Sequence, residues 1–164
     1  MDPKALAHPI RAAAAITDQY EIVVIGSQSI LGAVPNAASE FLLSMEADLY
    51  PLHRPELSDL IDGSIGELSA FESCFGYYAQ GVGVNTATLP SGWETRLVKI
   101  QNSNTDMKIG LCLETHDMAA SKLVAGRDKD LPFVEAMIRH DIIKPGLLLA
   151  RSDALPIAPE KKND

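Results

Sequence analysis

The segment Glu21–Leu52, EIVVIGSQSILGAVPNAASEFLLSMEADLYPL, governs the predicted architecture of this chain. It opens with the apolar, β-branched run Ile22–Ile25, which is typical of a buried strand. The run stops at Gly26 and Ser27, where a residue without a Cβ lets the backbone turn sharply and come close to a ligand. We therefore expect a strand, a tight turn and a short helix whose N-terminal N–H groups suit a phosphate.

A second strand is expected at Ser44–Tyr50, and it carries two acids. Because side chains alternate along a strand, Glu46 and Asp48 share one face while their apolar neighbours point the other way. Two carboxylates on an otherwise apolar strand are costly to desolvate unless a cation or hydrogen-bond donors meet them. Mg²⁺, or Mn²⁺, is the natural candidate, and a solvated strand face is the alternative.

Length and charge limit the class of protein. A chain of 164 residues is long enough to bury roughly 70% of the surface that it exposes when unfolded. We expect one domain over residues 1–155 and a flexible polar tail over residues 156–164. The net charge of −8 disfavours a general DNA- or RNA-binding protein, because phosphate contacts need a basic face.

The sequence also predicts a cytoplasmic protein. No apolar run approaches the roughly 20 residues that cross a membrane. The first fifteen residues lack the order of a signal peptide, because their apolar part is mostly alanine and is interrupted by His8–Arg11. Cys74 and Cys112 have no metal-type spacing, so we expect free thiols in a reducing compartment.

The remaining elements alternate between helices and strands. Further strands are expected at Tyr77–Val84 and, as a hairpin, at Thr95–Gln101 and Met107–Leu113. Helices are expected from a first turn around Pro9 to Asp18, over Arg54–Phe75 with a new start at the capping box Ser64–Glu67, and over Thr115–Ala125, Asp128–His140 and Lys144–Ser152. The predicted fold class is α+β, a small mixed sheet of four or five strands flanked by helices, with a helical C-terminal part.

The charged segment Lys122–Asp130, KLVAGRDKD, has two interpretations. Taken alone it indicates a solvated helix end, with basic residues near the negative end of the helix dipole and an acid capping the next helix. Lys122 and Arg127 lie on either side of Gly126, which is well placed to end a helix. They converge only if two helices meet at an angle, with Asp130 facing back to hold Arg127.

Together, these features resemble a known family. A strand, a Gly-Ser turn and an acid-x-Asp strand resemble the core signature of the polymerase-β-type nucleotidyltransferase fold in its minimal bacterial form. The segment Lys122–Asp130 resembles the Lys/Arg/Asp motif of AbiEii-like nucleotidyltransferase toxins, from abortive-infection and type IV toxin–antitoxin systems. The resemblance covers Glu21–Leu52 and Leu113–Met137, less than half of the chain.

The resemblance assigns expected roles to seven residues. It implies nucleotide phosphates at Gly26 and Ser27, Mg²⁺ or Mn²⁺ at Glu46 and Asp48, and a catalytic segment formed by Lys122, Arg127 and Asp130. These roles agree with the chemistry of the residues, because metal ions held by carboxylates can bridge nucleophile and leaving phosphate while cations stabilise the developing charge.

The sequence departs from the family pattern at two points. Glu46 stands where the family usually has Asp, and the third acid that the family commonly places on the next core strand is missing from Tyr77–Val84. Glu94 or Glu114 could supply that acid in space. Two hypotheses follow: a metal-dependent nucleotidyltransferase moving a nucleotidyl group from NTP to an RNA or protein acceptor, as a toxin with an antitoxin partner or in phage defence, or a catalytically degenerate binding or regulatory module.

Overall fold

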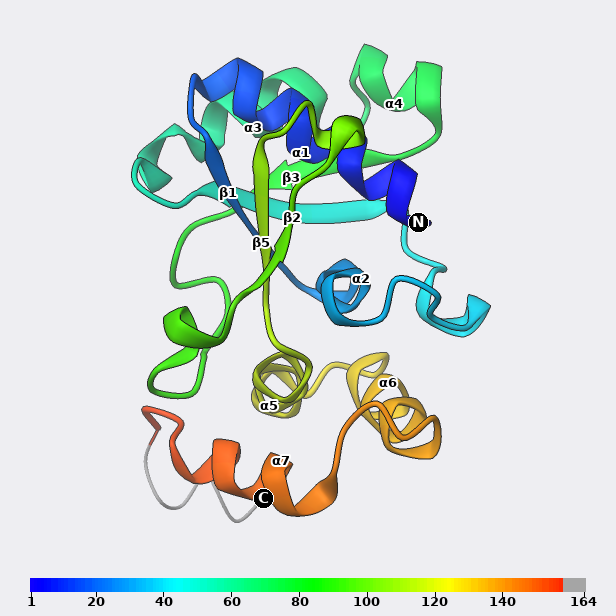
Figure 1. Ribbon diagram of the computed structural model, residues 1–164, viewed down its shortest axis with the longest axis vertical. Coiled ribbons are helices and arrows are strands. Elements are labelled where there is room, and N and C mark those ends of the chain that lie inside the picture. The colour runs from blue at the N-terminus through cyan, green and yellow to red at the C-terminus, as the bar shows by residue number, and fades with distance from the viewer. Residues whose placement is uncertain (158–164) are drawn as a thin grey trace.

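A computed structural model describes residues 1–157, and its centre is one mixed sheet of five strands in the order β3-β2-β1-β5-β4 (Figure 1). The strands are β1 (Glu21–Ile25), β2 (Glu46–Pro51), β3 (Tyr78–Gly81), β4 (Val98–Ile100) and β5 (Ile109–Cys112). Strand β1 runs antiparallel to β2 and parallel to β5, while β3 is parallel to β2 and β4 is antiparallel to β5. The predicted α+β class with a small mixed sheet is confirmed. Residues 158–164, most of the predicted tail, lie outside the described residues.

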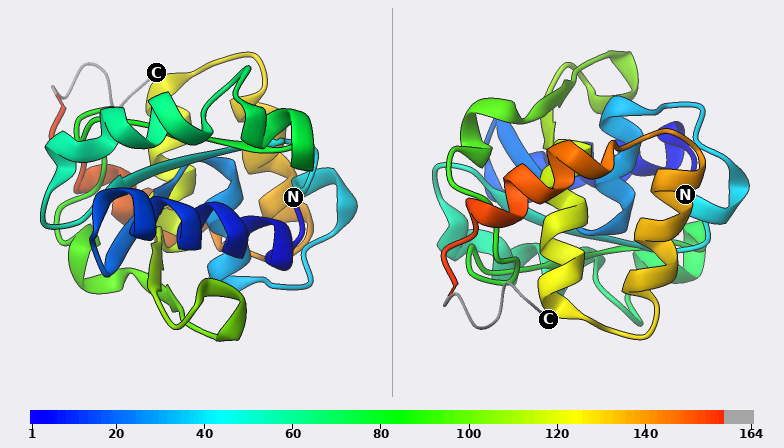
Figure 2. Two further views of the ribbon diagram at one scale, coloured as in Figure 1. Left: turned by 90° about the horizontal axis from the view of Figure 1, so that it is seen from above. Right: turned by 90° about the horizontal axis from the view of Figure 1, so that it is seen from below.

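Within residues 1–157, seven α-helices surround the sheet. They are α1 (Pro3–Thr17), α2 (Ile30–Ala33), α3 (Ser58–Ile65), α4 (Ala70–Phe75), α5 (Thr115–Ala125), α6 (Asp130–Arg139) and α7 (Pro145–Asp153). Figure 1 shows α1, α3 and α4 above the strands and the C-terminal helices α5, α6 and α7 below them, and Figure 2 views these two groups from above and from below. Among the described residues, no helix is both long and apolar enough to cross a membrane.

The centre of the core is β1, as the apolar run predicted. Its residues Ile22–Ile25 are buried because β1 is the middle strand and has neighbours on both sides. Leu6 and Ile10 of α1 are fully buried in the same core. Gly110 of β5 lets α1 pack closely, since a Cβ there would lie 2.7 Å from Ile10 Cδ1. This packing holds the carboxyl end of β1 in a defined place.

The first helix begins earlier than predicted. Asp2 is its N-cap and accepts a hydrogen bond from the Ala5 N–H at 2.8 Å, and Pro3 occupies the first turn. Pro9 therefore lies inside α1 and not in its first turn. A proline inside a helix costs one hydrogen bond, which is why a first-turn position was expected. The expectation was wrong because the buried face of α1 offsets that cost here.

The capping box predicted at Ser64–Glu67 is also wrong. Ser64 lies within α3, and α4 begins after Ser69, whose Oγ accepts the N–H of Glu72 at 3.2 Å. The Glu72 carboxylate in turn accepts the N–H of Leu68. The same S-x-x-E pattern occurs at Ser69–Glu72, so the local sequence offered two starts and packing selected the second.

The predicted hairpin is present, but its first strand is shorter. Strands β4 and β5 pair as expected, with Val98 opposite Cys112. Residues Trp93–Arg96 form a 3₁₀ turn in place of the expected strand start. Arg96 lies in this turn and donates a hydrogen bond to Asp117 of α5, 21 positions away in the sequence.

Candidate functional site

The turn after β1 lies directly against the acidic strand. Ile25 is opposite Asp48 in the antiparallel pair of β1 and β2, so the following Gly26 passes beside the Asp48 carboxyl group. Gly26 has φ +74°, and a Cβ there would lie 2.6 Å from Asp48 Oδ2. Both the backbone angle and the close approach require glycine. Gly26, which was expected to let the backbone approach a ligand, thus also places the turn beside the acid pair.

The two acids of β2 differ in how readily they ionise. Burial, a hydrogen bond with Glu46 and the charge of Glu46 raise the pKa of Asp48 to about 7. Burial also opposes the ionisation of Glu46, but hydrogen bonds from Asp48 and Tyr78 outweigh it and lower the pKa of Glu46. Glu46 therefore ionises at a lower pH than Asp48, and the surroundings of Asp48 favour its neutral form.

Tyr78 supports the acid pair from the neighbouring strand. Its hydroxyl donates a hydrogen bond to Glu46 Oε2 at 2.7 Å, because the parallel register of β3 places Tyr78 opposite Glu46. Tyr77 points elsewhere, and its hydroxyl lies 2.8 Å from His8 Nδ1. Sequence reasoning did not assign Tyr78 to the site, since alternation shows that the two rings face opposite ways but not which strand lies beside them.

The acid pair fits a divalent cation. Asp48 Oδ1 is buried and has no hydrogen-bond partner, although buried carboxylate oxygens almost always have one. Mg²⁺ commonly takes one or two protein carboxylates and completes its coordination with water and phosphate oxygens. Within residues 1–157, no group of three or more His, Cys, Asp or Glu could hold a metal. Glu46 and Asp48 are the two acids of this site that could hold such an ion.

The basic segment meets the Gly-Ser turn. Lys122 of α5 is buried, and its Nζ donates to Ser27 Oγ at 2.8 Å and lies 3.4 Å from Asp130 Oδ1. Asp130 also accepts hydrogen bonds from Arg127, at 2.8 Å from Nε and 3.2 Å from Nη2. Gly126 ends α5 in the left-handed conformation, with φ 61°, which turns the chain toward α6. Lys122, Arg127 and Asp130 thus form one cluster, in the arrangement that the sequence analysis required.

A cavity of about 290 Å³ joins these groups. Asp48, Lys122 and Arg127 all line it, beside Gly26 at the end of β1. Burial lowers the pKa of Lys122, and the Asp130 carboxylate opposes that effect. The sequence analysis did not identify the remaining wall, which consists of Ile25, Thr86, Ala87, Leu113, Met118, Ser121 and Ala125. These residues carry no charge or motif that could have distinguished them from ordinary core and loop positions.

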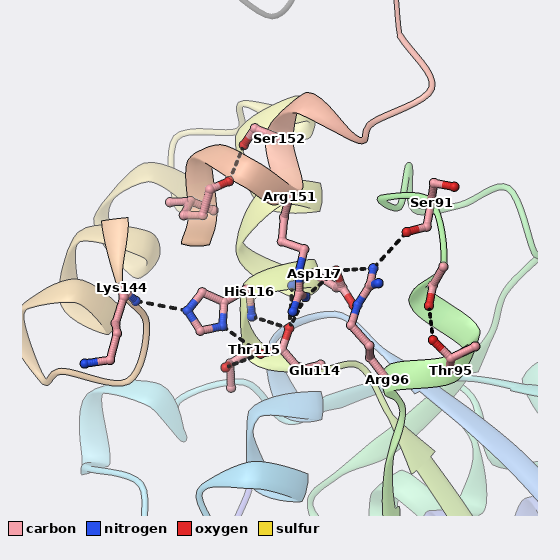
Figure 3. Close-up of polar contacts among 12 residues, drawn as sticks. Ser91, Thr95, Arg96, Glu114, Thr115, His116, Asp117, Lys144, Arg151 and Ser152 are labelled. Atoms are coloured by element: carbon pink, nitrogen blue, oxygen red, sulfur yellow. Dashed lines mark hydrogen bonds and ion pairs between the residues drawn. The ribbon is translucent and has the colours of Figure 1, made fainter. Parts of the chain in front are cut away.

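Glu114, one of the two acids considered as a third ligand, lies in a different network (Figure 3). It is the N-cap of α5, where it accepts the N–H groups of His116 and Asp117. Its carboxylate also contacts Arg151 Nη1 at 2.6 Å and His116 Nδ1 at 2.6 Å. Glu94, the other acid considered, is exposed in the 3₁₀ turn before β4. Glu114 thus has cationic partners of its own.

Asp117 is the centre of this network. An acid in the first turn of a helix is commonly an exposed partner of the helix dipole, but the Asp117 side chain is fully buried. It accepts from Arg96 Nε at 2.8 Å and from Arg151 Nη1 at 2.9 Å (Figure 3). These contacts tie the turn before β4 and helix α7 to the first turn of α5. They therefore hold the helix that carries Lys122.

Comparison with known proteins identifies a family that spans the site. Residues 4–152 match the model of a family described as "Nucleotidyltransferase of unknown function (DUF6036)". The match includes β1, β2 and the Lys122–Asp130 segment, and so contains every residue of the candidate site. No curated protein and no solved structure matches the chain.

Proposed function

The chain belongs to the DUF6036 family of nucleotidyltransferases, and we propose from this that it is a metal-dependent enzyme acting on NTP. It moves a nucleotidyl group to an RNA or protein acceptor. The observation that carries the proposal is the contact of Lys122 Nζ with Ser27 Oγ, on the cavity that Asp48 also lines. The cavity is lined by the ammonium group of Lys122, the glycine turn at Gly26 and the carboxyl group of Asp48, with Glu46 next to Asp48. A cation and backbone N–H groups can bind the phosphates of a triphosphate, and the two acids can hold its metal ion.

Each predicted residue has a role in this proposal. Gly26 and Ser27 bind phosphate oxygens, Lys122 neutralises their charge, and Arg127 binds the outer phosphates from the mouth of the cavity. Asp130 is a positioning residue, because it holds both cations and is itself fully buried. Glu46 and Asp48 hold Mg²⁺ or Mn²⁺, which supplies charge neutralisation at the phosphates when bound. Tyr78 orients Glu46.

The reaction exchanges a phosphoanhydride bond of the NTP for a phosphoester bond to the acceptor. A nucleophilic oxygen of the acceptor forms a bond to the α-phosphorus while the bond to the pyrophosphate oxygen breaks. The negative charge that develops on pyrophosphate is met by Lys122 and Arg127. The acceptor loses its proton to solvent as the new bond forms. Glu114 contacts Arg151 and His116 and is not assigned as the base.

Incubation with labelled nucleotide tests the proposal directly. The protein is mixed with each of the four labelled NTPs, Mg²⁺ or Mn²⁺, and total cellular RNA, with Asp48→Asn as the matched inactive variant. We expect label in RNA or in a protein band with the wild type and none with Asp48→Asn. Binding of NTP without transfer would instead support the degenerate binding module, and absence of both binding and transfer would reject the proposal.

The setting that we propose is a toxin–antitoxin or phage-defence system. It rests on the resemblance of Lys122–Asp130 to the motif of AbiEii-like toxins. Induced expression of the wild type in a bacterial host should arrest growth, whereas equal amounts of Asp48→Asn should not. Growth arrest by both proteins, or by neither, would contradict a toxic nucleotidyl transfer.

A further inference from the structure

A second cavity, of about 380 Å³, lies between α6 and the loop that precedes β2. Its wall includes Phe41 and Ala136, together with Lys129 at the start of α6. The Gly-Ser turn contributes Ser27 and Gln28 to the same wall. None of the groups assigned to phosphate or metal other than Ser27 lines this cavity, so its function is a separate question.

Lys122 stands between the two cavities. Its side chain lines the first cavity, and its Nζ bonds to Ser27, which lines the second. The same Nζ lies 4.4 Å from the ring centroid of Phe133, another wall residue of the second cavity. Lys122, which lines the first cavity, thus contacts two wall residues of the second, so the two cavities adjoin at this side chain.

The walls of the second cavity suit a planar, partly polar group. Phe41 and Phe133 meet edge to face, with ring centroids 5.3 Å apart, and both residues line the cavity, Phe133 partly exposed and Phe41 buried. Gln28 is 1% exposed and donates through Nε2 to the Phe41 carbonyl at 3.3 Å, but its Oε1 has no hydrogen-bond partner. An unpaired buried acceptor is unfavourable, so it favours a ligand that carries an N–H donor.

We propose that the second cavity is the nucleobase subsite for the NTP whose phosphates lie in the first. The proposal rests on the proposed function, because it takes the phosphates to bind at Ser27 and Lys122. Aromatic walls bind the faces of any base, and every base offers a ring or exocyclic N–H that Gln28 Oε1 can accept. A lipid chain or an apolar side chain offers no such donor, which is why the cavity favours a base.

Calorimetry with two kinds of ligand separates this inference from the proposed function. Inorganic tripolyphosphate with Mn²⁺ occupies only the phosphate site, whereas an NTP with Mn²⁺ occupies both. We expect the wild type to bind NTP at least tenfold more tightly than tripolyphosphate. Wild type that binds neither ligand would reject the proposed function, and this inference with it.

Two variants then probe the second cavity. Ala136→Met fills it and Gln28→Met removes the unpaired acceptor at similar side-chain length; each should weaken NTP binding about tenfold and leave tripolyphosphate binding unchanged. Ala15→Met, the same change as the first on an exposed position of α1, should alter neither. Folded variants that bind NTP as tightly as the wild type would overturn the base subsite while leaving the phosphate site in place.

Photolabelling covers the case in which both variants fail to fold. An azido-purine NTP, crosslinked to the wild-type protein and digested, should label a peptide that contains Phe41 or Phe133. Labelling confined to the wall of the first cavity, at Thr86–Ala87 or Leu113–Met118, would place the base there and would overturn the inference.

Discussion

Lys122 Nζ donates a hydrogen bond to Ser27 Oγ at 2.8 Å, although the two residues are 95 positions apart in the sequence. The contact joins the middle of α5 to the turn that follows β1. Because Lys122 is only 4% exposed, its charge is directed into the site and not toward solvent. The Gly-Ser turn and the Lys122–Asp130 segment are each ambiguous alone, and this contact joins them into one cluster of side chains.

Replacement of Lys122 by Met should remove the charge while keeping the buried stem. We expect NTP affinity to fall by roughly 1.5–3 kcal/mol, the range for a charge-assisted hydrogen bond. Stability should change little, because Asp130 keeps its contacts with Arg127. Isothermal titration of NTP measures the effect, and Lys99→Met, at an exposed position of β4, is the control. Normal NTP binding by Lys122→Met would show that the Ser27 contact is only structural.

Asp48→Asn should be more stable than the wild type at alkaline pH. The pKa of Asp48 is raised to about 7 from 3.8, so the folded state holds this proton more tightly than the unfolded state. The stabilising effect of that proton is full below about pH 4 and is lost as the pH rises through 7. Without divalent cations, the variant should gain roughly 1–3 kcal/mol over the wild type at pH 8 and much less at pH 5.

Chemical denaturation in a chelator at both pH values measures this difference, with exposed Asp62→Asn as the control. Adding Mn²⁺ at pH 8 should then raise the Tm of the wild type and leave that of Asp48→Asn unchanged, because a ligand stabilises only the state that binds it. Equal responses to Mn²⁺ would mean that Asp48 is not a metal ligand.

Gly26→Ala should destabilise the protein and disrupt the site together. The new Cβ would lie 2.6 Å from Asp48 Oδ2, at a backbone φ of +74° that disfavours alanine. We expect a loss of roughly 1–3 kcal/mol in the free energy of unfolding, and loss of NTP binding by the protein that remains folded. Gly63→Ala, inside α3 with open space around its Cβ, should instead be neutral or stabilising by up to about 1 kcal/mol. Similar effects of the two changes on NTP binding would argue against a phosphate turn.

Asp130 and Arg127 should differ sharply in their effect on stability. Removing Asp130 leaves the buried Lys122 without its carboxylate, so Asp130→Ala should cost roughly 3–5 kcal/mol. The Arg127 side chain is 57% exposed, so Arg127→Ala should cost no more than about 1 kcal/mol. Both variants should bind NTP weakly. Asp130→Ala leaves Lys122 and Arg127 misplaced, whereas Arg127→Ala loses a direct contact with the phosphates. Chemical denaturation measures the stability of each variant, and titration with NTP measures its affinity. A larger loss of stability in Arg127→Ala than in Asp130→Ala would contradict the prediction.

Glu114→Gln tests whether this acid belongs to the structural network or to the metal site. Burial disfavours its charge, but hydrogen bonds from His116 and Arg151 lower the pKa of Glu114 to about 2. Its stabilising effect is therefore present above about pH 4.5 and is lost as the pH falls toward 2. The variant should be roughly 2–3 kcal/mol less stable than the wild type at pH 7, with a smaller difference at pH 3.

Mn²⁺ and NTP affinities of Glu114→Gln should equal those of the wild type if the network is structural. Glu135→Gln, at an exposed position of α6, is the matched control and should change neither stability nor binding. Loss of Mn²⁺ binding in the folded Glu114→Gln variant would make this acid a third metal ligand after all.

Local sequence patterns were sufficient for the parts of the fold whose cause is local. The β-branched run of β1, the alternation that puts Glu46 and Asp48 on one face, and the glycine that ends α5 follow from backbone geometry over a few residues. The same local rules failed at Pro9, which lies inside α1, and at the capping box, where two S-x-x-E patterns competed and the helix uses the second.

The tertiary structure was needed for everything that depends on register or on contacts between distant segments. Alternation alone could not place Tyr78 beside Glu46, because the pairing of β2 with β3 is set by the packing of whole elements. Sequence could not show that Asp117 is buried between Arg96 and Arg151, since exposure is a property of the assembled fold. The raised pKa of Asp48 has the same origin: its carboxyl group became unusual only when burial removed water from it and brought Glu46 within hydrogen-bonding distance.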